Sequence, residues 1–273
     1  MDAALPFPAI VPHGELSDLV TAEYPDARLS DLLLAPAVRA PLERVLHGQR
    51  QRGLLESRGF APIRRLLLTG PVGTGKSMTA SALAAELSLP LVTIRVDALI
   101  SMDVDETAAK LRVVFDVMTY IRTRAAYLFD DFYAGGQRAA RNDIREARRA
   151  LGTLLWFLDA TQPESLVVAA IIRPSVLGNA LIRRFDSVIT YALPDSAQAI
   201  EVLRRRLGTM NTSQVSWSEV GDHVVDLSHA ELVRAAESAA RRAILDGDDA
   251  VSTAALVTSL GEYRSASHDR GTG

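Results

Sequence analysis

The sequence predicts an α/β fold in which a parallel β-sheet is followed by a smaller all-helical unit. Short apolar or β-branched segments alternate with helical patterns between residues 63 and 194, which is typical of parallel strands joined by helical crossovers. The first of these segments leads directly into a glycine-rich loop and then a helix. Beyond Pro194 only helical patterns remain. We therefore expect a sheet with helices on both faces and a separate helical unit after it.

Composition narrows the classes of partner and the cellular location. The 273 residues include 30 basic and 33 acidic side chains, and the net charge of −3 favours neither nucleic acid nor a membrane as the partner. The chain has no cysteine, which excludes disulfides and cysteine-ligated metals and suits a reducing compartment. It has no long uncharged apolar stretch, and its first residues lack the features of a secretion signal. We expect a soluble cytoplasmic protein.

Residues 1–62 are expected to form a leader and a helical linker. Alanine and proline are frequent in the first 14 residues, as in a poorly ordered terminus. A short helix is expected over residues 15–24, and a longer amphipathic helix over residues 37–55.

Residues 63–194 are expected to form an αβα sandwich around a five-stranded parallel sheet. The strand patterns cover residues 66–68, 91–96, 127–131, 165–172 and 187–192. Residues 195–264 are expected to form a small all-helical domain, with helices over residues 197–207, 230–245 and 253–260. Residues 265–273 are polar and are expected to be a disordered tail.

The most informative stretch runs from Gly70 to Ser77 and fits the pattern G-x-x-x-x-G-K-[ST] of a phosphate-binding loop. Gly73 and Gly75 would let the backbone pass close to a phosphate chain without a Cβ clash, and the loop N–H groups and the helix N-terminus would face the anion. Lys76 would place its charge beside the β- and γ-phosphates, and the Ser77 hydroxyl would bind Mg²⁺. We expect a nucleotide to be bound by Gly70, Pro71, Val72, Gly73, Thr74, Gly75, Lys76, Ser77 and Met78.

A second informative stretch is a hydrophobic strand pattern that ends in two carboxylates, Asp130 and Asp131. In phosphate-loop enzymes an aspartate at this position holds Mg²⁺, so Asp130 is a predicted metal-site residue. Asp131 follows it and is a candidate general base that would polarise an attacking water.

The phosphate loop, the strand ending in these carboxylates, residues 177–186 and the helical C-terminal part together resemble an AAA+ ATPase of the AAA type. The resemblance covers residues 29–260 and implies an αβα nucleotide-binding domain with a helical lid. It also implies Mg²⁺-dependent ATP hydrolysis at subunit seams, assembly into homo-oligomeric rings that are often hexamers, and action on a protein or another macromolecule. Matched to the family's motif, Arg183 and Arg184 are arginine-finger candidates that would reach the γ-phosphate of a neighbouring subunit.

The sequence departs from the family pattern at three places. Asp131 stands where the family normally has glutamate, and since a misplacement of about 1 Å can lower a rate roughly 100-fold, slow hydrolysis is expected. Ile172 stands where the family normally has an asparagine that orients the attacking water, and its side chain cannot form a hydrogen bond. Asp103 and Asp105 occupy the aromatic and glycine positions of the family's pore loop, and this acidic loop does not suit threading of an unfolded chain through apolar contacts.

The start of one C-terminal helix corresponds to a family segment of small residues near the nucleotide. Ser228 is a good N-cap for this helix, and Glu231 completes a capping box. We expect His229 to be a surface residue at the helix start rather than a nucleotide contact.

These observations favour an AAA+ ATPase that couples slow hydrolysis to the remodelling or regulation of a macromolecular partner, and a protein is the expected partner. The alternative is a nucleotide-binding regulatory or scaffold subunit with negligible hydrolysis, which explains both Asp131 and Ile172. A nucleic-acid-dependent ATPase is a weaker third hypothesis, because the near-neutral net charge does not favour it.

Overall fold

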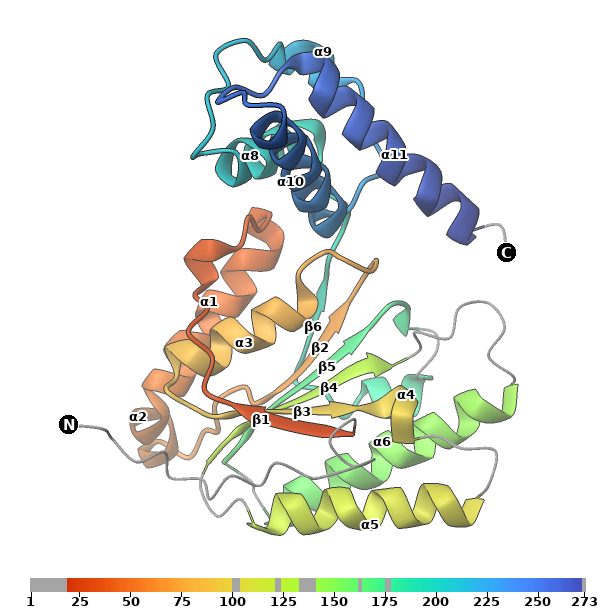
Figure 1. Cartoon of the computed structure of the whole chain (residues 1–273). Helices are drawn as coiled ribbons and strands as arrows, with labels where there is room; N and C mark the ends of the chain where they lie inside the picture. The colour runs from red at the N-terminus through yellow and green to blue at the C-terminus, as the bar shows by residue number, and fades with distance from the viewer. Residues whose placement is uncertain are drawn as a thin grey trace, which may run out of the picture. The chain divides into compact units, whose positions relative to one another are not determined.

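The computed structural model describes residues 19–99, 104–120, 124–132, 141–161, 164–174 and 178–271. These residues form two compact units (Figure 1). The first unit comprises residues 19–32, 36–70 and 76–190, and the second comprises residues 33–35, 71–75 and 191–271. The second unit therefore includes the middle of the phosphate loop and a short strap of three residues, 33–35.

The first unit is built on a six-stranded sheet in the order β1-β3-β4-β5-β2-β6. Five of the strands are mutually parallel and β1 is antiparallel to β3, so the predicted α/β fold with a parallel sheet is confirmed. The strands are β1 (Val20–Glu23), β2 (Arg65–Thr69), β3 (Leu91–Arg95), β4 (Ala126–Phe132), β5 (Leu166–Ile171) and β6 (Ser187–Thr190).

The strand β1 replaces a predicted helix. A short helix was expected over residues 15–24, but residues 20–23 pair antiparallel with residues 91–94 of β3. The physical reason is non-local, because the edge of β3 offers unpaired backbone groups that a four-residue helix could not satisfy in the same place. Val20 is buried in the core as a result.

Helices cover both faces of this sheet (Figure 1). The helices α1 (Pro36–Arg50) and α3 (Lys76–Glu86) lie on one face, with the 3₁₀ turn η1 (Leu29–Asp31) and α2 (Arg52–Ser57) nearby. The opposite face is covered by α4 (Val96–Leu99), α5 (Val104–Tyr120) and α6 (Arg141–Thr161), and α7 (Asn179–Ile182) precedes β6. The core between the sheet and this second group contains Tyr127, Phe129, Met118 and Leu154, all fully buried.

From Tyr191 onward the second unit consists of helices joined by loops. Its helices are α8 (Ser196–Arg206), α9 (Trp217–Gly221), α10 (His229–Leu245) and α11 (Thr253–Gly271). Apolar side chains from these helices form their own core, which includes Leu203, Leu232, Ala236, Leu256 and Leu260.

Helix α11 extends beyond its predicted end. The expected helix stopped at residue 260 and was followed by a disordered tail from residue 265, whereas the backbone is helical as far as Gly271. No proline interrupts this stretch, and Glu262 anchors it by accepting hydrogen bonds at both carboxylate oxygens from Arg242 of α10, each at 2.7 Å.

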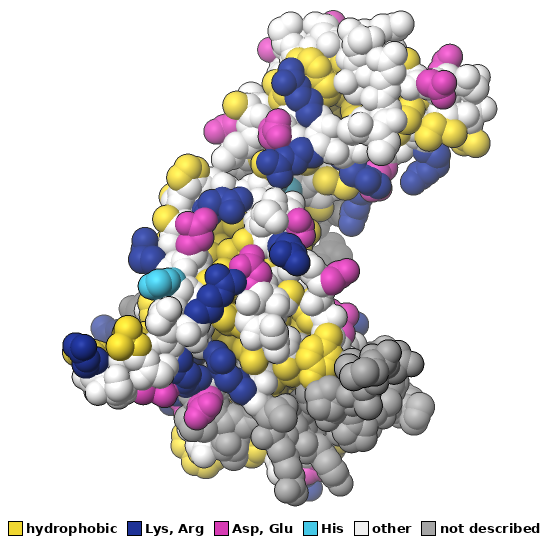
Figure 2. Space-filling model, turned by 90° about the vertical axis from the view of Figure 1, so that its left-hand side faces the viewer, with side chains coloured by type: hydrophobic (Ala, Val, Ile, Leu, Met, Phe, Trp, Pro, Cys, Tyr) yellow, Lys and Arg dark blue, Asp and Glu magenta, His cyan; other side chains and the backbone are white. Residues whose placement is uncertain are grey.

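Charges are mixed over the surface. On the face shown in Figure 2, basic and acidic side chains are interspersed rather than gathered into a field of one sign. Among the described helices, none combines the length and the apolar character that a bilayer crossing requires.

Candidate functional site

The phosphate loop begins at the end of a fully buried strand. Leu66, Leu67 and Leu68 of β2 are inaccessible to solvent, and the Gly70 N–H donates to the Ile171 carbonyl at 3.1 Å. The start of the loop is therefore fastened to the end of β5. Helix α3 begins at Lys76, so the structure has the strand, loop and helix in the order that the sequence predicts.

The loop backbone uses conformations that favour glycine. Gly70, Gly73 and Gly75 have φ values of 138°, 77° and 95°, a region that residues with a Cβ rarely occupy. Thr74 is buried, and its hydroxyl donates to the Pro71 carbonyl at 2.8 Å. The loop is therefore held in a curled form by its own contacts.

Two polar side chains stand at the start of α3. The Lys76 ammonium donates to the Gly70 carbonyl at 2.8 Å, which keeps it against the first residue of the loop. Ser77 is exposed at the second position of the helix. These are the positions that a phosphate-binding lysine and a Mg²⁺-binding hydroxyl would need.

The two predicted carboxylates lie at a β-bulge in β4. Between the pairs that Phe129 and Phe132 make with β5, β4 has two residues, Asp130 and Asp131, where β5 has one. The strand was expected to end at residue 131 but continues to Phe132. Asp130 is partly exposed, and the Asp131 side chain lies outside the described part of the structure. Because β2, β4 and β5 are parallel, this bulge and the phosphate loop both lie at the carboxyl ends of the strands.

The residue at the sensor position follows β5 directly. Ile171 is the last residue of β5 and is buried in the core. Ile172 comes next and is half-buried. Neither side chain can orient a water by hydrogen bonding. Of the expected acidic pore loop, Asp103 and the side chain of Asp105 lie outside the described residues.

The arginine-finger candidates follow the short helix α7. Arg183 and Arg184 are both exposed. The Arg184 guanidinium donates to the Gly152 carbonyl at 3.4 Å, whereas the Arg183 guanidinium has no hydrogen bond or ion pair within the part of the chain that the structure describes. Both guanidinium groups are accessible from outside the subunit.

Asp186 holds this arginine segment to the start of the phosphate-loop strand. Its carboxylate accepts hydrogen bonds from the Arg64 and Arg65 N–H groups, both at 3.0 Å, and from the Arg65 guanidinium at 3.0 and 3.2 Å. Burial opposes ionisation of Asp186, but these hydrogen bonds and the Arg65 charge outweigh it and lower the pKa. Sequence reasoning missed this role because the partners are 121 and 122 residues apart and no local motif joins them.

In the second unit, helix α10 packs directly against the phosphate loop. Ser228 and Glu231 form the predicted capping box. Two residues after Ser228, the Ala230 N–H donates a hydrogen bond to the Gly73 carbonyl of the loop at 3.0 Å. A Cβ placed on Gly73 would lie 2.6 Å from Ser228 Oγ and 3.0 Å from Ala230 Cβ. The loop can therefore have only glycine at this position while the helix stays in contact.

His229 joins the same helix to the strap of residues 33–35. Its Nε2 lies 3.1 Å from the Leu33 carbonyl oxygen, and its Nδ1 is buried without a hydrogen-bond partner among the described residues. Burial lowers the pKa of the imidazole, although the hydrogen bond to Leu33 opposes the shift. The residue stands at the start of the helix, as expected, but it is half-buried rather than fully exposed. Its partial burial goes with the contact to Leu33, 196 residues away, which local sequence does not reveal.

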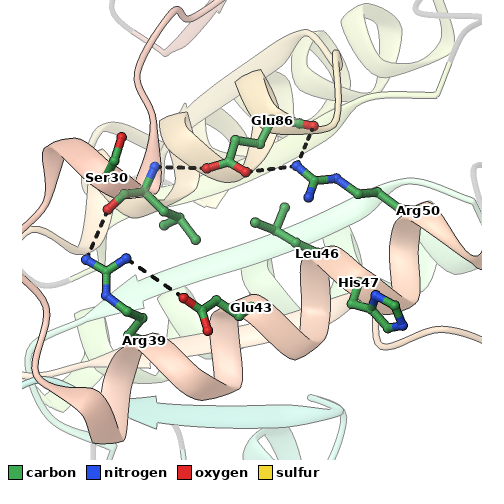
Figure 3. Close-up of a pocket in the computed structure, with 8 residues that line it drawn as sticks. Ser30, Arg39, Glu43, Leu46, His47, Arg50 and Glu86 are labelled. Atoms are coloured by element: carbon green, nitrogen blue, oxygen red, sulfur yellow. Dashed lines mark hydrogen bonds and ion pairs between the residues drawn. The ribbon is translucent and has the colours of Figure 1, made fainter.

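A separate polar pocket of about 360 Å³ lies between η1, α1 and the end of α3 (Figure 3). Glu86 accepts hydrogen bonds there from the Leu29 N–H at 3.0 Å and from Arg50 at 2.8 Å, and Arg39 donates to the Leu32 carbonyl at 3.0 Å. Its two glutamates are paired with two arginines, Arg39 with Glu43 and Arg50 with Glu86, so the lining has no excess of positive charge for a phosphate chain. Its contacts instead hold η1 and α1 to the phosphate-loop helix.

The chain matches a known family over the region that contains this site. The family described as "ATPase family associated with various cellular activities (AAA)" matches residues 66–193. An uncharacterised AAA family ATPase of Sinorhizobium fredii is 32% identical over 191 residues, which cover 69% of this chain and 57% of the relative.

Two further relatives have names that state an activity. An ATP-dependent zinc metalloprotease FtsH of Acidothermus cellulolyticus is 33% identical over 196 residues, which cover 68% of this chain and 29% of the relative. A proteasome-activating nucleotidase of Methanococcus vannielii is 28% identical over 207 residues, which cover 73% of this chain and 51% of the relative. The chain thus spans less than two thirds of the length of each of these relatives.

Proposed function

Because the chain contains an AAA-family ATPase domain, we propose that it binds Mg²⁺-ATP in the loop from Gly70 to Ser77 and hydrolyses the ATP slowly. The observation that carries this proposal is the conformation of the loop. Three glycines with positive φ follow a buried strand and precede a helix. This arrangement exposes successive N–H groups to an anion and brings the helix N-terminus towards it.

The residues at the sheet edge fit a nucleotide with its metal ion. Lys76 would neutralise the β- and γ-phosphates, and the Ser77 hydroxyl together with the Asp130 carboxylate would hold Mg²⁺. A Mg²⁺ ion held by these residues would supply positive charge beside the phosphates. The backbone N–H groups from Val72 to Gly75 would bind the phosphates. Pro71, which has no N–H, would border the nucleotide together with the exposed Val72 and Met78.

Hydrolysis would use residues from two subunits. Asp131 would act as the general base of its own subunit. Arg183 and Arg184 are exposed, so in a ring they would reach the nucleotide of a neighbouring subunit and stabilise its transition state. The carboxylate of Asp131 is one methylene shorter than that of glutamate, and Ile172 cannot orient the water, so turnover would be slow.

The partner of this ATPase is proposed to be a protein. This part of the proposal is supported by the relatives, one of which is named as a metalloprotease and another as a proteasome-activating nucleotidase. We propose that a homo-oligomer, in the manner of the rings that the family resemblance implies, couples hydrolysis to the remodelling or regulation of that protein.

A regulatory subunit that holds ATP without hydrolysing it is the second candidate. The specific observation in its favour is the half-buried Ile172 directly after β5, because its side chain cannot orient an attacking water by hydrogen bonding.

The double substitution Asp131→Glu/Ile172→Asn separates the two candidates. If the chain is a slow ATPase, restoring both side chains should raise the rate of phosphate release by about tenfold or more, and Lys76→Ala in the same background should abolish the gain. An unchanged rate in a variant that still binds ATP would contradict the enzyme and favour the regulatory subunit.

A further inference from the structure

Helix α6 has an exposed tryptophan, Trp156, on the surface that also holds the arginine-finger candidates. We propose that Trp156 anchors the seam between two subunits, where it packs against the phosphate-loop edge of a second, nucleotide-bound copy of this chain. This inference rests on the proposed function, in which Arg183 and Arg184 reach the nucleotide of a neighbouring subunit.

The outward side of α6 has one large apolar group. The inward side of the helix is rich in leucine and is buried in the core, whereas Trp156 is 64% exposed. The exposed residues that share its side of the helix, at helical spacing, are Arg149, Thr153 and Ala160. The outward side of a helix that covers a sheet is normally polar, and exposed aromatic side chains beside arginine are typical of protein interfaces.

Arg184 is held at the same place on α6. Its guanidinium donates to the Gly152 carbonyl at 3.4 Å. In an α-helix this carbonyl also accepts the N–H of the residue four positions on, which is Trp156. Helical side chains lean towards the helix N-terminus, so the indole covers the turn that contains Gly152. Trp156 and the arginine-finger segment therefore belong to one surface.

The charge of this surface restricts the partner. Its exposed cations are Arg149, Arg183 and Arg184. The carboxylates of Asp159 and Asp186, in the same two segments, are paired with the arginines at the start of β2 and do not neutralise these cations. A basic surface with an apolar centre fits a partner that has negative charge beside exposed apolar groups.

The phosphate-loop edge of a second copy meets both requirements. The bound triphosphate would supply the negative charge, and Met78, in the first turn of α3, is 45% exposed. Methionine is flexible and packs favourably on aromatic rings. Because α6 and α3 lie on opposite faces of the sheet (Figure 1), the contact would join two different surfaces. Such a head-to-tail contact can close into a ring, and it would bring the arginines to the nucleotide.

Tryptophan fluorescence of the full chain tests this contact directly. The chain has two tryptophans, so Trp217→Phe leaves Trp156 as the only emitter. Its emission maximum is followed over a range of protein concentrations, with and without Mg²⁺-ATP, and sedimentation velocity gives the degree of assembly in the same samples. The critical variant is Trp156→Ala. Phe60→Ala is the matched control, because Phe60 is 66% exposed and lies before β2, whereas the phosphate loop lies after it.

We expect the emission of Trp156 to move to shorter wavelength as the chain assembles with Mg²⁺-ATP, since the indole would leave water. Trp156→Ala should need about 10- to 100-fold more protein for half-maximal assembly, whereas Phe60→Ala should assemble like the unaltered chain. Because the Trp156 side chain is exposed, its removal should preserve the fold and ATP binding. Phosphate release by Trp156→Ala should therefore recover at high protein concentration.

An assembled chain in which Trp156 keeps the emission of an exposed indole would overturn the inference. Equal assembly of Trp156→Ala and Phe60→Ala would do the same, and both results would leave the proposed ATPase standing. A dimer that forms equally well without ATP would also overturn the inference, because the bound nucleotide would then have no part in the contact. A chain that binds ATP but assembles at no concentration would overturn the proposed subunit seam together with this inference.

Discussion

The packing of helix α10 on the phosphate loop makes Gly73→Ala the most informative single substitution. Gly73 has a φ of 77°, and a Cβ on it would lie 2.6 Å from Ser228 Oγ and 3.0 Å from Ala230 Cβ. The new methyl group would therefore meet atoms of the capped helix start, which is fixed by its own hydrogen bonds. Either the loop or the helix has to move.

The size of the effect follows from two separable contributions. A residue with a Cβ in the left-handed region is disfavoured by about 1–2 kcal/mol, and overpacking of a tight contact costs about 1–3 kcal/mol. Gly247→Ala provides the matched control, because Gly247 lies in the same unit, has a φ of 83° and has open space around its missing Cβ. Gly247→Ala should therefore lower the free energy of unfolding only by the cost of placing a residue with a Cβ in the left-handed region.

Urea denaturation with and without Mg²⁺-ATP measures both consequences. Gly73→Ala should lower the free energy of unfolding by about 1–3 kcal/mol more than Gly247→Ala does, and only Gly73→Ala should weaken ATP binding. Equal losses of stability in the two variants, with ATP affinity unchanged in both, would refute the contact between loop and helix.

Two further predictions concern the contacts around the site. Asp186→Asn should lower the free energy of unfolding by about 1–2 kcal/mol at pH 7, since a charged hydrogen-bond acceptor is lost. The lowered pKa of Asp186 means that its stabilisation is present above the unfolded-state value of about 3.9 and is lost as the pH falls through the folded-state pKa. As the pH is lowered from about 7 to about 3, the urea midpoint of Asp186→Asn should therefore fall less steeply than that of the unaltered chain. Parallel pH profiles of the two proteins would contradict this prediction. Ser228→Ala should lower stability by about 1 kcal/mol and also weaken ATP binding, whereas Asp195→Ala, which removes the capping box of α8, should affect stability only. A nucleotide titration that shows equal affinities for both capping variants would count against the role of α10 at the loop.

Much of the fold was predictable because its signals are local. The segment from Gly70 to Ser77 contains its strand, its glycines and its helix start within a few residues, and the alternation of strands and helices fixes the parallel sheet. The same holds for the capping box of Ser228 and Glu231, which needs only four consecutive residues.

The features that sequence did not predict depend on contacts between distant residues. The strand β1 exists because β3 has a free edge, and the bulge at Asp130 and Asp131 depends on the register with β5. Asp186 and His229 acquire their roles from partners more than 100 residues away. No periodicity or motif along the chain encodes these pairs, so only the folded arrangement shows them.

The most direct test of the ATPase proposal is phosphate release from Mg²⁺-ATP over a range of protein concentrations. The unaltered chain should show slow turnover per subunit that rises with concentration as subunit seams form. Lys76→Ala should abolish it by preventing productive ATP binding, and Arg183→Ala/Arg184→Ala should abolish it while leaving ATP binding intact. Phosphate release that is independent of concentration and unaffected by both sets of substitutions would contradict a catalytic site built from this loop and these arginines.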